Sequence, residues 1–505
     1  MATEILKAKN GSDCAKANGV FLHSQYNPQI EAERFAQNVR ANFVPEKIII
    51  IEGALGYVAS ELKKKFPSAK IGTIRFSKDF FSWNEKFDFI IDASDFAQSK
   101  KNANSLSEKI FNALGEEGVF KTLFLEWPPS ARAFSNETKF AWQEIKSATE
   151  KARAILATRE HFEKKWLKNK INFFRKIKNV AHFEKVDFPI LICASGPSLK
   201  SAIPLIKKTR EKIFLASLSS SISVLFHEGI FPDICFSTDG GFWAKKHLDP
   251  LEHERFQKIP LALAIEGECA SAIFEKNAIL PLCYDDDAIS KKLFAALEIP
   301  YMQARRNGTV SGTALEFFLA NGGKEIFFAG LDLAGGETFA HAQPNALELD
   351  AAQKDFRLRT KATRIAKASL PSPSLEIYAA WFSNFSWKGE QKVFRIRGEE
   401  GFKNSLGKIK DISSKDVETI LKNHAEKNLH REIHHDKFLA NENRNRAIKN
   451  ELLEFSKSEE WQKELFPSEC ILRDRAASDE ESQKHSKAIF EKTENILKEI
   501  FERLK

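Results

Sequence analysis

The sequence predicts an α/β protein whose central domain is Rossmann-like, with a mostly parallel sheet. A smaller N-terminal α/β domain and a C-terminal helical region should flank it. Between residues 185 and 415, short apolar or β-branched runs alternate with helical stretches, the pattern of a parallel sheet covered by helices. Two strand-like runs, Lys47–Glu52 and Phe87–Ile91, lie within the first 135 residues. From residue 416 onward the chain is charged, free of glycine and helix-periodic.

These patterns set the expected domain boundaries. A chain of 505 residues has room for two or three domains. Residues 1–135 should form a degenerate Rossmann-like domain and residues 184–415 the central domain. Residues 136–183 should be a helical linker, because no proline or glycine interrupts them before residue 180. Residues 416–505 should form a helical domain, with Pro467 as its one interruption.

Composition narrows the class of protein. At 43% hydrophobic and 29% charged, the chain is near the globular average, which argues against a disordered or fibrous protein. The net charge of +8 is a mild excess without a concentrated basic stripe, so we expect no nucleic acid partner. Six cysteines without a CxxC pair indicate reduced thiols, and we find neither a signal peptide nor a membrane span. We therefore expect a soluble cytoplasmic protein.

Six strands are expected in the central domain. In a parallel sheet, ligands bind at the carboxyl ends of the strands, so the residues that follow each strand are the informative ones. The expected strands are Phe188–Ala194, Ile213–Ser217, Asp233–Thr238, Pro260–Ile265, Ile279–Tyr284 and Glu325–Gly330.

The turn after the first of these strands contains Gly196, Pro197 and Ser198. Glycine permits close approach of a ligand, proline suits a first helical turn, and the serine adds a hydroxyl, a combination that favours a phosphate. The alternative is an ordinary strand-to-helix turn. The turn is neither a Walker A loop nor a GxGxxG motif.

Hydroxyl, acidic and glycine residues follow later strands. Ser219 lies in a serine cluster, and Asp239 precedes two glycines, where it can bind a sugar hydroxyl or form an Asx-turn. Gly308, Thr309 and Ser311 follow two arginines and start a helix, which indicates either an anion site or a capped helix.

The last expected strand ends at Gly330 and is followed by Asp332 and, nine residues later, His341. A carboxylate at the strand tip and a histidine in a glycine-containing loop can supply acid–base chemistry at one edge of the sheet. A histidine in this position can equally be structural.

Several segments together resemble the motility accessory factors, which are flagellin glycosylation proteins. Their central domain is described as 6-hydroxymethylpterin-diphosphokinase-like and is similar to bacterial sialyltransferases. The matching segments are GPSL (196–199), GIFPDICFSTD (229–239), the run from 308 to 334, TFAHA (338–342), FLHSQYNP (21–28) and EGALGY (52–57).

The resemblance implies a glycosyltransferase. It would move a nonulosonic acid of the pseudaminic or legionaminic type from a CMP-sugar onto Ser or Thr of flagellin, with inversion and without cofactor or metal. Asp332 would lie at the sugar, and His341 would be the base that deprotonates the acceptor hydroxyl. The residues implied to bind the donor are Gly196, Pro197, Ser198, Ser219, Asp239, Gly308, Thr309, Ser311 and Gly330.

Two other functions stay open. One is an ATP-dependent diphosphokinase of a pterin alcohol, which would need Mg²⁺ and has Asp239 and Asp332 as candidate ligands. The other is a non-catalytic chaperone that binds flagellin.

In the N-terminal domain, the turn at residues 53–56 resembles a methyltransferase loop. Arg75 stands where a cofactor ribose would require an acid, so we expect no cofactor there. His430 and His434 have the spacing of a helical metal pair, but no third ligand accompanies them, and we expect no metal.

Overall fold

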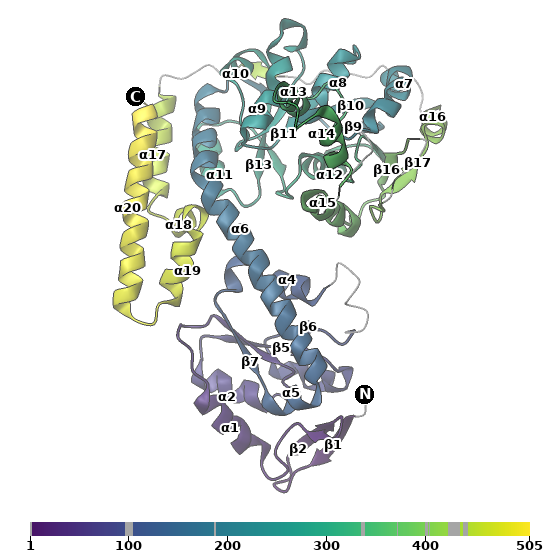
Figure 1. The fold of residues 1–505 in the computed structure, drawn as a ribbon. Helices are drawn as coiled ribbons and strands as arrows, with labels where there is room; N and C mark the ends of the chain where they lie inside the picture. The colour runs from purple at the N-terminus through teal and green to yellow at the C-terminus, as the bar shows by residue number, and fades with distance from the viewer. Residues whose placement is uncertain are drawn as a thin grey trace. The chain divides into compact units, whose positions relative to one another are not determined.

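The computed structural model describes residues 3–95, 105–185, 188–334, 339–370, 372–398, 402, 404–422, 435–437 and 443–504. The chain forms two compact units, drawn in Figure 1. The first unit contains Met1–Glu163 and Ser458–Ile496, and the second contains Lys164–Lys457 and Leu497–Lys505. A single helix of 42 residues, α6 (Ser135–Lys176), occupies the expected linker and contributes to both units.

The first unit is built on a parallel four-stranded sheet in the order β6-β5-β4-β7. Alternate residues of β4 face opposite sides: Ile48 and Ile50 pack with α1 and α2, while Ile49 and Ile51 pack with α4 and α6. The elements are β4 (Lys47–Ile51), β5 (Lys70–Arg75), β6 (Phe89–Asp92), β7 (Thr122–Glu126), α1 (Pro28–Asn38), α2 (Tyr57–Lys65) and α4 (Leu106–Gly118). A small antiparallel sheet precedes them, formed by β1 (Thr3–Lys7), β2 (Asp13–Ala17) and β3 (Val20–Phe21).

The second unit contains an eleven-stranded sheet in the order β17-β16-β15-β9-β10-β11-β12-β13-β8-β18, with β14 also paired to β13. Its described strands pair in parallel, except that β18 is antiparallel to β8. All six expected strands are present, and the predicted α/β class with a mostly parallel central sheet is confirmed. The strands are β8 (Asn179–Ala181), β9 (Ile190–Cys193), β10 (Phe214–Leu218), β11 (Ile234–Ser237), β12 (Leu261–Ala264), β13 (Ile279–Tyr284), β14 (Met302–Ala304), β15 (Glu325–Ala329), β16 (Lys392–Ile396), β17 (Lys410–Ile412) and β18 (His435–Lys437).

Helices cover both faces of this sheet, as in a doubly wound fold. Ile190 and Ile192 of β9 pack with helices on one face, α12 (Val310–Asn321) and α15 (Pro373–Asn384). Leu191 and Cys193 pack with helices on the other face, α7 (Leu199–Thr209), α8 (Ile222–His227) and α16 (Ser414–Lys422). Since β9 has apolar residues on both sides, it is buried at the centre of the unit.

Four further helices lie at the C-terminal end of the chain: α17 (Arg444–Phe455), α18 (Glu459–Leu465), α19 (Pro467–Arg475) and α20 (Asp479–Arg503). Pro467 begins α19, the position where a missing backbone N–H is best tolerated. A second interruption separates α19 from α20, where the Ser478 hydroxyl accepts a hydrogen bond from the Glu481 N–H. The helical character predicted for this region is therefore confirmed, with more interruptions than the one expected.

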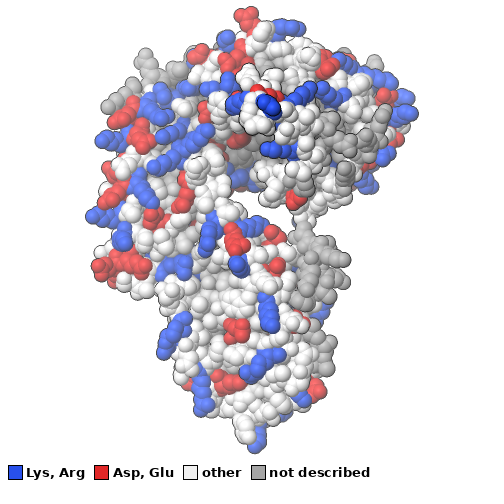
Figure 2. All heavy atoms as spheres, in the orientation of Figure 1, with Lys and Arg blue, Asp and Glu red and all other residues white. Residues whose placement is uncertain are grey.

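Basic and acidic side chains are intermixed on the face drawn in Figure 2, and uncharged areas lie between them. Among the described residues, no helix combines the length and the apolar character that crossing a membrane would require.

Candidate functional site

The order of strands creates a topological switch point between β9 and β15. From β9 the chain proceeds outward on one side through β10, β11 and β12, whereas β15 to β17 lie on the other side. Because all these strands are parallel, the loops that leave β9 and β15 start side by side at the carboxyl edge. Ligands of open α/β sheets bind in the crevice at such a point.

Four predicted residues meet at the switch point. The N–H of Gly196 donates to the carbonyl of Gly330 at 2.8 Å. The carboxylate of Asp332 accepts a hydrogen bond from the N–H of Ser198 at 2.9 Å and another from its hydroxyl. A side chain at residue 196 would bring its Cβ within 2.6 Å of the Asp332 carboxyl carbon, so this position requires glycine. The turn is thus fixed by the neighbouring loop.

Asp332 therefore has a partner that the sequence did not indicate. Its side chain binds the first turn of α7, so both of its oxygens are used within the protein. Burial raises the pKa of Asp332, while the two bonds from Ser198 oppose that rise. Its expected contact with a sugar stays a prediction.

His341 lies on a loop that crosses the carboxyl ends of β9 and β10. The N–H of Ala342 donates to the carbonyl of Ser195 at 2.8 Å, immediately after β9. The side chain of Asn345 donates to the carbonyl of Ser220 at 3.2 Å, in the short helical turn Ser219–Ser221 that follows β10. The structure therefore brings His341 to the same edge as Ser198 and Ser219.

Two residues near His341 were missed by the sequence analysis. Glu348, in α13 (Ala346–Gln353), has its Oε1 3.7 Å from His341 Nδ1. His247, in α9 (Phe242–Leu248), is buried, and burial together with the positive charge of a protonated His341 lowers its pKa to about 4. Burial also lowers the pKa of His341 itself, and the negative charge of Glu348 opposes this effect. The site thus holds two imidazoles and a carboxylate.

Asp239 and the loop before α12 lie at the same edge of the sheet. The Asp239 side chain accepts a hydrogen bond from the Gly241 N–H at 2.9 Å, which is the Asx-turn alternative considered above. Thr309 is the N-cap of α12 and accepts from the Gly312 N–H at 2.9 Å. Gly308 has a φ of +80° with open space around its α-carbon. Ser311 is buried beside Thr309. Their expected contacts with a donor stay predictions.

One of the two arginines before that loop is already paired. Arg306 makes two hydrogen bonds to the carboxylate of Glu266, at 2.6 and 2.8 Å, and its guanidinium lies over the rings of Tyr284 and Trp166. The Glu266 carboxylate also lies 3.5 Å from the ammonium of Lys170 on α6. Arg306 therefore holds β12 and α6 together and is not an unoccupied anion site.

In the first unit, protein groups fill the turn that resembles a nucleotide-binding loop. Arg75 is buried and bonds to the carboxylate of Glu52 at 2.8 Å and to the carbonyl of Ala54 at 2.7 Å. The ring of His23 accepts a hydrogen bond from the Leu55 N–H at 3.2 Å. Glu52 and Ala54 both have positive φ, a strained conformation for residues other than glycine.

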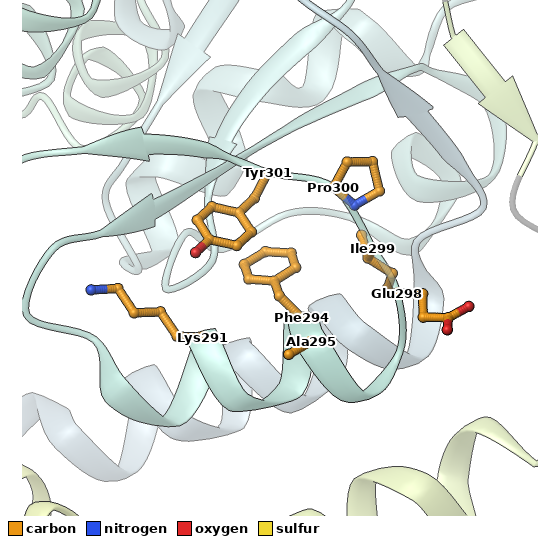
Figure 3. A pocket seen from close by; sticks show the side chains of 7 residues that line it. All are labelled: Lys291, Phe294, Ala295, Glu298, Ile299, Pro300 and Tyr301. Atoms are coloured by element: carbon orange, nitrogen blue, oxygen red, sulfur yellow. The ribbon is translucent and has the colours of Figure 1, made fainter.

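A pocket of about 470 Å³ lies elsewhere on the second unit (Figure 3). It is lined by the end of α11 (Ala288–Ala296) and by residues 298–301, where Phe294 stacks on Tyr301. Since residues 298–301 precede β14, this pocket is at the amino edge of the sheet, opposite the predicted site. None of the predicted site residues lines it.

Among the residues that the structure describes, no three His, Cys, Asp or Glu side chains are grouped as for a metal ion. His430 and His434 lie outside the described residues.

Comparison with known proteins adds to this geometry. Residues 161–338 match a family model described as 6-hydroxymethylpterin diphosphokinase MptE-like. The central domain is therefore similar to this family over residues 161–338. The matched range contains all the predicted site residues except His341, which follows it by three positions. Glu348 also lies beyond the match.

Two individual proteins illustrate the similarity. An uncharacterised protein of Treponema pallidum (strain Nichols) is 32% identical over 305 residues, which are 59% of this chain and 65% of that protein. The match therefore spans just under two thirds of this relative. The structure of MAf glycosyltransferase from Magnetospirillum magneticum AMB-1 has a TM-score of 0.53 at 13% identity, over 99% of this chain and 92% of that one. The resemblance predicted from the sequence is thus confirmed as an MptE-like domain and a MAf-like fold.

Proposed function

We propose that this protein is a glycosyltransferase that moves a nonulosonic acid from a CMP-sugar onto Ser or Thr of flagellin. The observation that carries the proposal is the extent of the fold similarity. It covers 99% of the chain, so it includes the first unit and the C-terminal helices as well as the MptE-like domain. Those flanking parts would be superfluous in an enzyme that acts only on a small pterin.

The arrangement at the carboxyl edge fits such a transfer. His341 acts as the base: its imidazole takes the proton of the acceptor hydroxyl as the oxygen attacks the anomeric carbon of the donor. The bond between that carbon and the phosphate oxygen breaks, and its electron pair leaves on the phosphate of CMP. The N–H groups at the start of α12 stabilise the phosphate, which lies beside the loop that follows β9. The donor therefore lies along residues 195–198 and 308–311.

A second function is favoured by the description of the family model. MptE-like domains are named after a 6-hydroxymethylpterin diphosphokinase, so transfer of diphosphate from ATP to a pterin alcohol is the alternative. The third possibility, a flagellin-binding chaperone, would use the same fold without catalysis.

A thermal-shift titration separates these functions, because a ligand that binds the native state raises the melting temperature. The ligands are CMP, CDP, ATP with Mg²⁺, and a pterin alcohol. We expect CMP and CDP to raise the melting temperature without metal. A response only to ATP with Mg²⁺ and pterin would establish the diphosphokinase instead. An unchanged melting temperature with all four ligands would favour the chaperone. A chaperone would also keep its activity in the variant His341→Ala.

A further inference from the structure

The buried Nδ1 of His341 faces the carboxylate of Glu348, to which the proposed function assigns no role. A histidine base needs one nitrogen free to accept a proton and the other held by a partner that fixes the tautomer and the ring. Among the described residues, His341 Nδ1 is buried without a hydrogen-bond partner. The Glu348 carboxylate, 3.7 Å away, is the anion closest to providing one.

We propose that Glu348 is the positioning residue of His341: its carboxylate binds Nδ1–H and thereby directs Nε2 toward the acceptor hydroxyl. The inference rests on the proposed function only in assuming that His341 receives the proton of a hydroxyl group. The pairing of Glu348 with His341 is a property of the ligand-free protein and stands apart from that function.

The backbone that follows His341 is held in place. Ala342 is bonded to Ser195, and Asn345 to Ser220, so the loop is anchored to two strand ends. The Asn345 side chain also caps α13 by accepting from the Leu347 N–H at 3.0 Å. The same residue thus fixes the loop that carries His341 and the helix that carries Glu348.

Glu348 does not serve the cap of its own helix. Asn345 and Glu348 have the three-residue spacing of a capping box, in which the glutamate would bind the N-cap backbone. Instead, Oε2 of Glu348 accepts a hydrogen bond from Arg364 at 3.0 Å, while Oε1 is the oxygen that faces His341. The carboxylate is therefore shared between an arginine and an imidazole.

Arg364 is itself fixed. Its Nε and Nη2 each donate to an oxygen of Asp355 at 2.8 Å, and its guanidinium lies over the ring of Phe339. The side chains of Glu348 and Arg364 are only 13% and 11% exposed. A hydrogen-bonded series of charged side chains, Asp355, Arg364 and Glu348, thus ends at His341.

The electrostatic need for Glu348 arises during proton transfer. When Nε2 takes the proton of the acceptor hydroxyl, a buried imidazolium forms, and it requires a negative neighbour. The other imidazole near it, His247 on α9, offers no charge at physiological pH because burial lowers its pKa to about 4, and the charge of Asp239 acts on His247. A separation of 3.7 Å is longer than a hydrogen bond and should shorten when the substrates bind, as is common for catalytic pairs.

The test compares Glu348→Gln and Glu348→Asp with the wild type, with Glu376→Gln as control. Glu376 is an exposed glutamate on α15, outside the site. The first readout is ¹⁵N NMR of labelled histidines in the ligand-free protein. We expect Glu348→Gln to lower the pKa of His341 by about 1 pH unit and to reduce the Nδ1–H tautomer. Glu348→Asp should retain part of both effects, and Glu376→Gln should match the wild type. An unchanged pKa and tautomer in folded Glu348→Gln would overturn the pairing.

The second readout is the transfer rate. In Glu348→Gln we expect kcat to fall about 100-fold, with KM for the CMP-sugar unchanged and the acid limb of the pH profile moved to lower pH. An unchanged kcat in that variant would overturn the positioning role. If the NMR effect is present but the wild type transfers no sugar, the proposed function fails while the pairing of Glu348 with His341 stands.

Discussion

Asp332, at the end of β15, accepts two hydrogen bonds from Ser198, at the start of α7, 134 residues earlier in the chain. The bonds join the two loops of the switch point, where the donor is proposed to bind. Asp332 is largely buried, so the loss of these bonds leaves polar groups without partners.

Substitutions of this pair should lower stability in a graded way. Ser198→Ala removes the hydroxyl bond and keeps the backbone bond, so we expect the free energy of unfolding to fall by about 1 kcal/mol. Asp332→Ala removes both acceptors and should lower it by about 2–3 kcal/mol. Chemical denaturation measures both changes. Ser486→Ala, an exposed position on α20, should change stability by less than about 0.5 kcal/mol. Equal stability of Asp332→Ala and the wild type would refute the structural role of the pair.

His23 should make the first unit sensitive to acid. Burial and the nearby positive charge of Lys86 lower the pKa of His23 to about 3. In the unfolded chain, His23 has the usual histidine pKa of about 6.5 and therefore binds a proton below that pH. The native state does not bind this proton until the pH is much lower. The contribution of neutral His23 to the free energy of unfolding is therefore fully present above about pH 6.5. It is lost as the pH falls below that value, by about 1.4 kcal/mol per pH unit.

The comparison that isolates this effect is His23→Gln, whose amide oxygen can still accept from the Leu55 N–H. Denaturation at pH 7 and at pH 5 should show a smaller acid-induced loss in His23→Gln than in the wild type. His161→Gln, which removes an exposed histidine, should behave as the wild type does. Identical losses in all three proteins would contradict the assigned cause.

The ion pair of Arg306 and Glu266 should be coupled in a double-mutant cycle. Arg306→Ala leaves the Glu266 carboxylate buried without its two hydrogen bonds, and we expect a loss of about 2 kcal/mol. This figure is reduced because the Arg306 side chain is 36% exposed. Adding Glu266→Gln should recover part of the loss, since a neutral amide replaces the buried carboxylate that has lost its two bonds to Arg306. Strictly additive effects would show that the two residues act independently.

The sequence predicted the interior of the fold well because buried strands are continuous apolar runs. All six strands expected in the central domain are present, and β13 has the predicted limits. Two of the strands that were missed lack that signal. Met302–Ala304 is three residues long and becomes a strand only by pairing with β13. Thr3–Lys7 is largely exposed, so no alternation of apolar residues marks it.

Candidate site residues could be proposed where the sequence pattern is local. Gly196 and Ser198 were proposed from their turn, and His341 from its position in a loop after a strand, and their roles stay predictions. Partners far apart in sequence were not. The sequence around Asp332 does not indicate that its oxygens bind Ser198, because the two residues come together only through the pairing of β15 with β9. Glu348 fits a local helix cap in the sequence, and its contact with His341 depends on how the loop is anchored.

The most direct test of the account is the intact mass of purified flagellin incubated with this protein and a CMP-activated nonulosonic acid. We predict a mass increase equal to one or more nonulosonic acid residues with the wild type, and none with His341→Ala of equal melting temperature. The flagellin should be purified from cells that lack this gene, so that its acceptor hydroxyls are unmodified. An unchanged flagellin mass with the wild-type protein, or the same increase with His341→Ala, would contradict the account.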